Sequence, residues 1–168
     1  VKAVENSAVN IEHISYIEAH GSGTSLGDPI EIDGIKSAFK QIRSKQTQKS
    51  NIKTDCGIGS VKSNIGHLES VAGLAGLVKV LYAMRYKTIP AMLHFEQQNP
   101  QINLTDTSFY FTDKTQPWIA PLDEKGETLP LLAGISSFGF GGVNAHVVIE
   151  EYRQPTEKKG NTTFETNI

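Results

Sequence analysis

The chain has 168 residues, 38% of them hydrophobic, which suits one globular domain with a packed core. Its 16 basic and 18 acidic side chains give a net charge of -2, which excludes a basic field that would hold nucleic acid or an anionic membrane. The longest apolar run, near residues 71–81, is shorter than the roughly 20 residues that span a bilayer, so no membrane span or signal peptide is predicted.

The first half predicts two strand-to-helix units. Residues 14–19 (ISYIEA) resemble a strand that ends at the glycine-rich HGSGTSLGD, and a helix follows from Asp28, with Pro29 at its first position, to about Arg43. A polar loop precedes a second strand at 58–63 and a helix at 68–86. Apolar residues surround this second helix on all sides, which predicts burial on more than one side between two layers.

The second half is less regular. Prolines divide residues 88–130, which we predict to be mostly loop with one short strand. Residues 131–137 and 145–150 predict an antiparallel pair joined by FGFGGVN. We expect a domain over 1–152 and a polar linker or disordered tail over 153–168. The start at Val1 suggests a piece of a larger polypeptide, and the single Cys56 excludes internal disulfides and suits a reducing, cytoplasmic setting.

Three glycine-rich turns follow strand-like runs: HGSGT at 20–24, KSNIGH at 62–67 and FGFGGVN at 138–144. Ligand sites in layered α/β folds collect at the carboxyl ends of strands, so these turns can meet at one pocket. His20 and His67 could each act as a base, donate to an oxyanion, bind a metal, or simply bond to the backbone. A zinc site is disfavoured because no tight histidine pairing such as HxxxH occurs, and no turn has the GK[ST] ending of a phosphate-binding loop.

Three further side chains have both a structural and a functional interpretation. Cys56 could be a nucleophile, but it lies in a polar approach to a strand, which favours a structural or surface thiol. Lys62 could be solvated, or it could act electrostatically because it lies five residues before His67. Glu69 could pair with Lys62 or favour the N-terminus of the following helix.

Three blocks identify a family resemblance. YIEAHGSGTSLGDPIE, GSVKSNIGHLESVAGLAGLVKV and GISSFGFGGVNAHVVIEEY resemble, in order, the C-terminal signature blocks of ketosynthase domains from modular polyketide synthases. The resemblance covers about residues 10–152 and implies the α/β thiolase fold, a five-layer αβαβα sandwich of which this chain is most of the second half. The last block is closest to synthases that use a separate acyltransferase. The family's cysteine nucleophile belongs to the absent first half, so Cys56 does not fill that role.

The resemblance also implies roles for residues. Ketosynthases join a cysteine-bound acyl chain to a malonyl-type unit in a decarboxylative Claisen condensation. His20 and His67 match the histidine pair of this reaction, and Lys62 matches the lysine that supports it. The remaining matches are the phosphopantetheine-binding hydroxyls of Ser22 and Thr24, the oxyanion-hole amide at Phe140, and the supporting residues Glu69, Gly141 and Asn144. Ser22 stands where the family more often has threonine, but it keeps the hydroxyl.

The implied partners are the N-terminal half of the ketosynthase, an acyl carrier protein that carries substrate on phosphopantetheine, and a second copy in a homodimer. No intrinsic cofactor or metal is expected. Two alternatives stay open: a non-catalytic unit that pairs with a partner chain or docks a carrier protein, and a non-elongating domain that only passes acyl chains on. Such non-elongating domains often lack the histidine that matches His20, so its presence favours the condensing enzyme.

Overall fold

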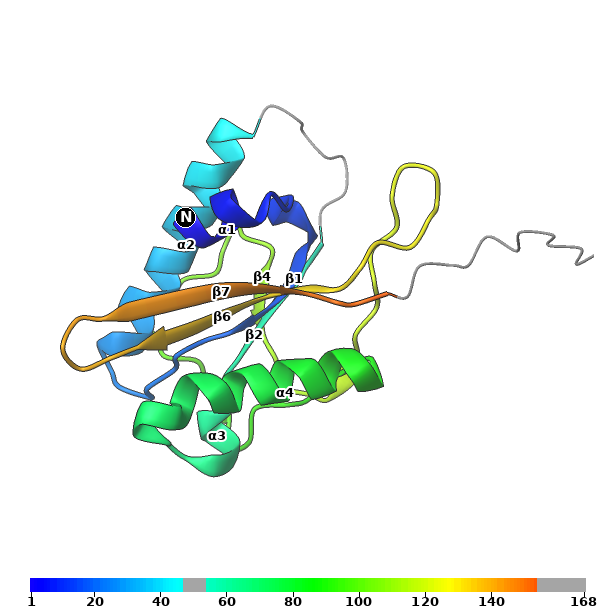
Figure 1. The fold of residues 1–168 in the computed structure, drawn as a ribbon. Coiled ribbons are helices and arrows are strands. Elements are labelled where there is room, and N and C mark those ends of the chain that lie inside the picture. Colours follow the sequence, from blue (N-terminus) through cyan, green and yellow to red (C-terminus); the bar gives the residue numbers. More distant parts are fainter. Residues whose placement is uncertain (47–53, 154–168) are drawn as a thin grey trace, which may run out of the picture.

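A five-stranded sheet forms the centre of the computed structural model, which describes residues 1–46 and 54–153 (Figure 1). Its strands are β1 (Ile14–Glu18), β2 (Cys56–Gly59), β4 (Phe109–Phe111), β6 (Leu132–Phe138) and β7 (Asn144–Glu150). They lie in the order β4-β2-β1-β6-β7. The first four are parallel, and β7 runs antiparallel to β6. The predicted glycine-rich hairpin over 131–150 is therefore confirmed, with Phe138 paired to Asn144 at its tip.

Helices cover both faces of this sheet, as Figure 1 shows. The helices are α1 (Lys2–Ser7) and α2 (Gly27–Lys45) on one face, and α3 (Lys62–Ile65) and α4 (Ala72–Tyr86) on the other. The smaller elements are the 3-10 helices η1 (Ile11–His13) and η2 (Glu69–Val71) and a ribbon of β3 (Thr88–Ile89) and β5 (Gln116–Pro117). This layering agrees with the α/β class predicted from the sequence.

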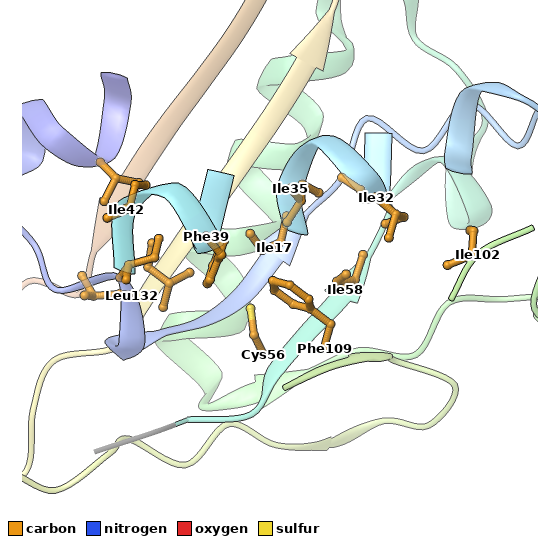
Figure 2. Close-up of a cluster of buried hydrophobic side chains, with 14 residues drawn as sticks. Ile17, Ile32, Ile35, Phe39, Ile42, Cys56, Ile58, Ile102, Phe109 and Leu132 are labelled. Atoms are coloured by element: carbon orange, nitrogen blue, oxygen red, sulfur yellow. The ribbon is translucent and has the colours of Figure 1, made fainter. Parts of the chain in front are cut away.

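Each face of the sheet has its own apolar core. Between α2 and the sheet, Figure 2 shows a cluster that includes Ile17, Phe39 and Phe109. On the opposite face, Tyr16 packs with residues of α4 that include Val80. Successive side chains of β1 thus enter different cores, as expected for a strand buried on both faces. The central position of β1 fixes the start of the loop that carries His20.

Helix α4 is buried on one face only, so the prediction of burial on more than one side is wrong for this chain. The residues toward the sheet are Ala72, Gly76, Val80, Ala83 and Met84. Leu74, Val78, Leu81 and Tyr82 are 60%, 52%, 49% and 54% exposed. The sequence pattern contains two apolar faces, but within residues 1–46 and 54–153 only one of them is covered, by the five-stranded sheet and β3.

The predicted helices begin at slightly different residues in the structure. Helix α2 begins at Gly27, so Pro29 is its third residue, and Asp28 accepts a hydrogen bond from the N–H of Gly23 instead of capping the helix from outside. The second long helix begins at Ala72 because Glu69 has a φ of 47°, outside the range of a right-handed α-helix.

Two predicted loop and strand regions also differ. The strand predicted at 58–63 ends at Gly59, and Lys62 and Ser63 belong to α3. The Val61 N–H donates to the carboxylate of Glu18, so the backbone turns away from the sheet there. Residues 88–130 contain β3, β4 and β5 instead of one strand. The two additional strands have two residues each, too short for a periodic signal.

Some predictions fall outside the described residues. The polar loop predicted before β2 falls partly on 47–53, and the tail predicted at 153–168 falls on 154–168 except for Arg153. The guanidinium of Arg153 donates to the carbonyl oxygens of Thr128 and Leu129. Among residues 1–46 and 54–153, no helix is both long and apolar enough to cross a bilayer.

Candidate active site

The two predicted histidines lie side by side. His20 follows β1, and His67 follows α3 at the end of the KSNIGH turn. Their ring centroids are 5.5 Å apart, with the rings nearly perpendicular. The His20 ring also lies 5.3 Å from the ring of Phe138, the last residue of β6. The three glycine-rich turns therefore meet at one place, as the positions of the strand ends predict.

Backbone hydrogen bonds fix the orientation of both imidazoles. The N–H of Phe138 donates to Nδ1 of His20 at 3.3 Å, and the N–H of Glu69 donates to Nδ1 of His67 at 2.8 Å. An Nδ1 atom that accepts a hydrogen bond carries no proton, so the proton of a neutral ring is on Nε2. Both histidines can therefore present an Nε2–H donor to a third group.

The surroundings of His20 favour its neutral form. Its pKa is lowered from the usual 6.5, first by burial and then by the positive charge of Lys62 and by His67, while Asp28 acts in the opposite direction. Burial also lowers the pKa of Lys62, and the nearby carboxylates of Glu18 and Glu31 oppose this effect. The site thus combines the N–H donors of two imidazoles with a half-buried lysine, an arrangement that suits stabilisation of a developing negative charge.

Ser22 and Thr24 lie on the exposed loop between β1 and α2. Their hydroxyl oxygens are 3.1 Å apart, and the Thr24 oxygen accepts the N–H of Gly27 at 3.0 Å. Both residues line a cavity of about 760 Å³ that extends to Lys62 and to the segment 92–100. Neither His20 nor His67 lines this cavity, but Ser22 also lines the neighbouring cavity that contains His20, so Ser22 is shared by the two cavities.

Phe140 and Gly141 lie at the tip of the β6–β7 hairpin. Phe140 has a fully exposed side chain, and in the described part of the chain its N–H donates to no acceptor. Gly141 lies in the same turn, closed by hydrogen bonds of Gly139 with Val143 and of Gly142 with Gly139. Asn144 begins β7 and lines, with His20 and Phe138, a second cavity of about 510 Å³.

Glu69 acts through its backbone. Within the described residues its carboxylate forms no ion pair with Lys62, and its position in η2 at a positive φ places its N–H on His67. Of the two roles considered for Glu69, the pairing with Lys62 is therefore not formed. Two other glutamates face that lysine instead.

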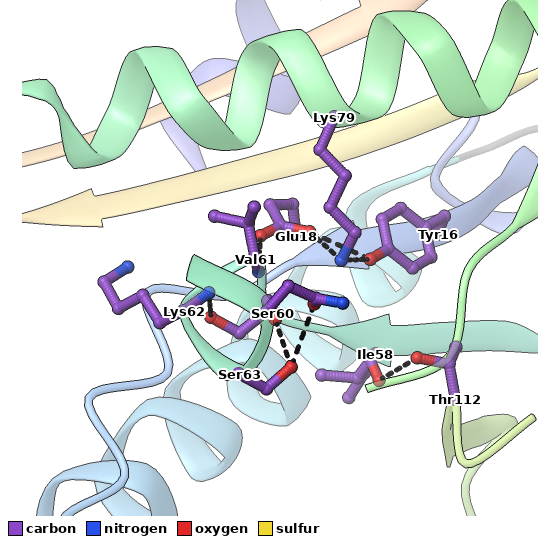
Figure 3. A network of polar contacts seen from close by, with 10 residues as sticks. Tyr16, Glu18, Ile58, Ser60, Val61, Lys62, Ser63, Lys79 and Thr112 are labelled. Carbon is purple, nitrogen blue, oxygen red and sulfur yellow. Dashed lines mark hydrogen bonds and ion pairs between the residues drawn. The ribbon is translucent and has the colours of Figure 1, made fainter. Parts of the chain in front are cut away.

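These two glutamates, Glu18 and Glu31, were not recognised from the sequence. Glu18 is 1% exposed, and Figure 3 shows it bound by three donors: the Tyr16 hydroxyl, the Lys79 ammonium and the Val61 N–H. Glu31, also buried, accepts the N–H groups of His20 and Gly21. A signal was available, because each acid occurs in an otherwise apolar pattern, where a charge needs a partner.

Cys56 is a structural thiol. It is the first residue of β2, it is buried in the core between α2 and the sheet, and burial raises its pKa far above the usual value. Such a thiol does not provide the thiolate that acts as a nucleophile. Among residues 1–46 and 54–153, no group of three or more His, Cys, Asp or Glu side chains could hold a metal ion.

A mostly parallel sheet with two adjacent histidines beyond its strand ends is typical of α/β enzymes. Comparison with known proteins identifies the family. The family described as "Beta-ketoacyl synthase, C-terminal domain" matches residues 1–96, and "Ketoacyl-synthetase C-terminal extension" matches residues 99–167. The chain therefore belongs to the β-ketoacyl synthase family, as the C-terminal part of a ketosynthase domain.

Its relatives are polyketide synthases. Polyketide synthase PksN of Bacillus subtilis is 51% identical over 150 residues, which are 89% of this chain and 3% of that synthase. Polyketide synthase ThaG of Burkholderia thailandensis is 48% identical over 147 residues, which are 88% of this chain and 2% of that synthase. The chain thus spans a small fraction of these synthases.

Solved ketosynthase structures have the same fold. An oxazolomycin ketosynthase domain from Streptomyces albus matches with a TM-score of 0.83 and 43% identity, over 92% of this chain and 26% of that one. The module 6 ketosynthase of the Bacillus subtilis bacillaene synthase matches with a TM-score of 0.74 and 40% identity, over 90% and 25%. The predicted thiolase-like fold class is confirmed.

Proposed function

We propose that this chain supplies the histidine pair of a polyketide ketosynthase that catalyses decarboxylative Claisen condensation. The observation that carries the proposal is the contact between His20 and His67, with each Nδ1 occupied by a backbone N–H. Two Nε2–H donors can then approach one thioester carbonyl oxygen. Membership of the β-ketoacyl synthase family supports this assignment.

The proposed reaction has two steps. In a malonyl-type thioester on a carrier protein, the carbon–carbon bond to the carboxylate breaks and carbon dioxide leaves. The electron pair of that bond stays with the thioester and forms an enolate. The Nε2–H groups of His20 and His67 donate to the enolate oxygen, and the cation of Lys62 adds electrostatic support. The enolate carbon then attacks the acyl thioester, a carbon–carbon bond forms, and the cysteine thiolate leaves. A donor aimed at a developing oxyanion contributes about 10²–10³-fold to the rate.

The other matched residues have binding roles in this proposal. The hydroxyls of Ser22 and Thr24 bind the phosphopantetheine arm along the cavity that they line. The Phe140 N–H, which has no acceptor in the described part of the chain, serves as an oxyanion-hole donor, and Gly141 and Asn144 shape that turn. The reaction needs no cofactor beyond the carrier-bound arm.

The nucleophile comes from the N-terminal half of the ketosynthase in this proposal, because the buried Cys56 cannot serve. The exposed apolar face of α4, formed by Leu74, Val78, Leu81 and Tyr82, is the surface on which that half packs. In the intact synthase we propose a cytoplasmic homodimer that works with a carrier protein, with the domain ending near residue 152. Similarity to ketosynthases of the bacillaene synthase supports the type that uses a separate acyltransferase.

Reconstitution tests this proposal. The chain expressed alone should neither decarboxylate malonyl carrier protein nor form a condensation product, and co-expression with the upstream ketosynthase segment should restore both activities. A second arm tests the packing surface: Val78→Asp places a charge on the apolar face of α4 and should prevent the restoration of both activities by the upstream segment. Decarboxylation by the isolated chain would show that the missing half is not required.

The same exposed face favours a second candidate, a non-catalytic unit that pairs with a partner chain or docks a carrier protein. This second candidate predicts a stable complex with the partner chain or the carrier protein but no condensation, and replacement of His20 should not change the stability of that complex. A non-elongating domain is a third candidate, and it predicts acyl loading without decarboxylation. The neutral, oriented imidazole of His20 favours the condensing enzyme over both.

A further inference from the structure

Glu31 holds the loop that carries His20. Its two carboxylate oxygens accept the N–H of His20 at 2.7 Å and the N–H of Gly21 at 2.8 Å. Gly21 has a φ of 49°, and a Cβ there would lie 2.7 Å from Cβ of Ser60, so the backbone is tightly placed against the neighbouring turn. The carboxylate thus fixes the peptide from which the imidazole projects.

Glu18 holds the other loop. Its Oε1 accepts the N–H of Val61 at 2.5 Å, and Val61 is the residue that precedes α3, whose C-terminal end leads to His67. Its Oε2 is fixed by the Tyr16 hydroxyl at 2.9 Å and the Lys79 ammonium at 2.8 Å (Figure 3). The network therefore connects the central strand and α4 to the start of the KSNIGH turn.

Both carboxylates also act on Lys62. Glu18 extends from β1 and Glu31 from α2, and each carboxylate interacts favourably with the Lys62 charge. His20, on the loop after β1, is a third titratable group that interacts with Lys62. Burial disfavours the Lys62 cation. Two anions that compensate this cost preserve the charge that the condensation site needs.

We infer that Glu18 and Glu31 are positioning residues that set the relative placement of the two imidazoles. The inference rests on the proposed function, because it concerns the same histidine pair. An amide in place of either carboxylate presents an N–H₂ group to a donor, so at least one backbone N–H or the Lys79 ammonium loses its acceptor. A displacement of about 1 Å in a reacting group can cost roughly 10²-fold in rate.

The test uses the intact ketosynthase that contains this chain, with the single variants Glu18→Gln and Glu31→Gln. The matched control is Glu12→Gln, because Glu12 also binds a cation, Arg43 at 2.5 and 2.9 Å, and lies before β1, at the opposite end of that strand from His20. Two rates are measured: loading of an acyl group onto the cysteine, a thioester exchange that forms no enolate, and decarboxylation of malonyl carrier protein. The pH profile of decarboxylation is recorded for each variant.

Both site variants should load acyl groups at the rate of the unmodified enzyme and decarboxylate at least about tenfold more slowly, with KM changed by less than about twofold. Loss of a carboxylate removes a favourable partner of the Lys62 cation, so its pKa falls and the alkaline limb of the profile moves to lower pH. The control should retain both rates and the profile. If Glu18→Gln also loses loading, Glu31→Gln decides by the same measurements.

Unchanged decarboxylation with an unchanged alkaline limb in the variants that still load would overturn the inference. Loss of loading in parallel with decarboxylation in both variants would also overturn it, because that result indicates a structural role alone. The double variant His20→Ala/His67→Ala is assayed beside them. If it decarboxylates normally, the proposed function fails, whereas a slow double variant with normal glutamate variants rejects only the positioning role.

Discussion

Alanine at Gly34 should stabilise the protein and alanine at Gly76 should not, although both glycines lie inside long helices. Gly34 is in α2, where an added Cβ would meet no atom within 4 Å. Gly76 is in α4, where an added Cβ would lie 3.0 Å from Cγ of Glu18 and 3.5 Å from Cγ2 of Ile135. The two substitutions therefore have the same helix propensity gain but different surroundings.

The magnitudes follow from these contacts. Replacing glycine by alanine inside a helix contributes about 1 kcal/mol of stability, so Gly34→Ala should be more stable by about that amount. At Gly76 the same gain is opposed by overpacking, which costs about 1–3 kcal/mol when the neighbours cannot move. The side chain of Glu18 is fixed by three hydrogen bonds and cannot yield easily. Gly76→Ala should therefore be less stable than Gly34→Ala by about 1–3 kcal/mol.

Urea unfolding of the intact ketosynthase, followed by the fluorescence of the buried Trp118, measures both variants under the same conditions. Gly34→Ala is the matched control, because it isolates the propensity gain. Equal stabilisation by the two substitutions would refute the argument, since it would show that the space between α4 and Glu18 accommodates a methyl group.

Two further predictions concern buried charges. Glu18 and Lys79 form an ion pair, and their side chains are 2% and 9% exposed. Lys79→Met leaves the buried carboxylate unpaired and should lower the free energy of unfolding by about 3–5 kcal/mol in urea titrations, whereas the double variant Glu18→Gln/Lys79→Met should recover most of this loss. A Lys79→Met variant as stable as the parent would contradict this prediction. Burial lowers the pKa of His146 from the usual 6.5, which favours the neutral ring in the folded protein, so stability is lost as the pH falls below 6.5. His146→Gln should reduce the difference in the free energy of unfolding between about pH 5 and about pH 7. An unchanged difference would reject this prediction.

The arrangement of the main elements could be predicted because the local signals were strong. Residues 14–19 and the turn at 20–24 locate the central strand and its functional end, and strand ends in a parallel sheet share one edge, which brings His20 and His67 together. The hairpin around FGFGGVN was predictable because two strand-like runs flank a glycine-rich turn. In each case a local pattern and the general rules of α/β folds agree.

Other features depend on contacts that sequence spacing does not contain. Lys62 and Ser63 resemble a strand continuation, but a carboxylate 43 residues away binds the Val61 N–H and redirects the backbone. Strands β3 and β5 exist because they pair with each other across a long separation. The apolar pattern of α4 correctly indicates two apolar faces, but only one has a partner layer within the described residues.

The most direct test of the account is the rate at which the intact ketosynthase decarboxylates malonyl carrier protein when His20 and His67 are replaced by alanine, singly and together. Each single replacement removes one N–H donor from the enolate oxygen and should lower the rate by about 10²–10³-fold, with acyl loading on the cysteine retained. A double variant that keeps loading and decarboxylates within about threefold of the parent rate would contradict the assignment of these imidazoles to the reaction.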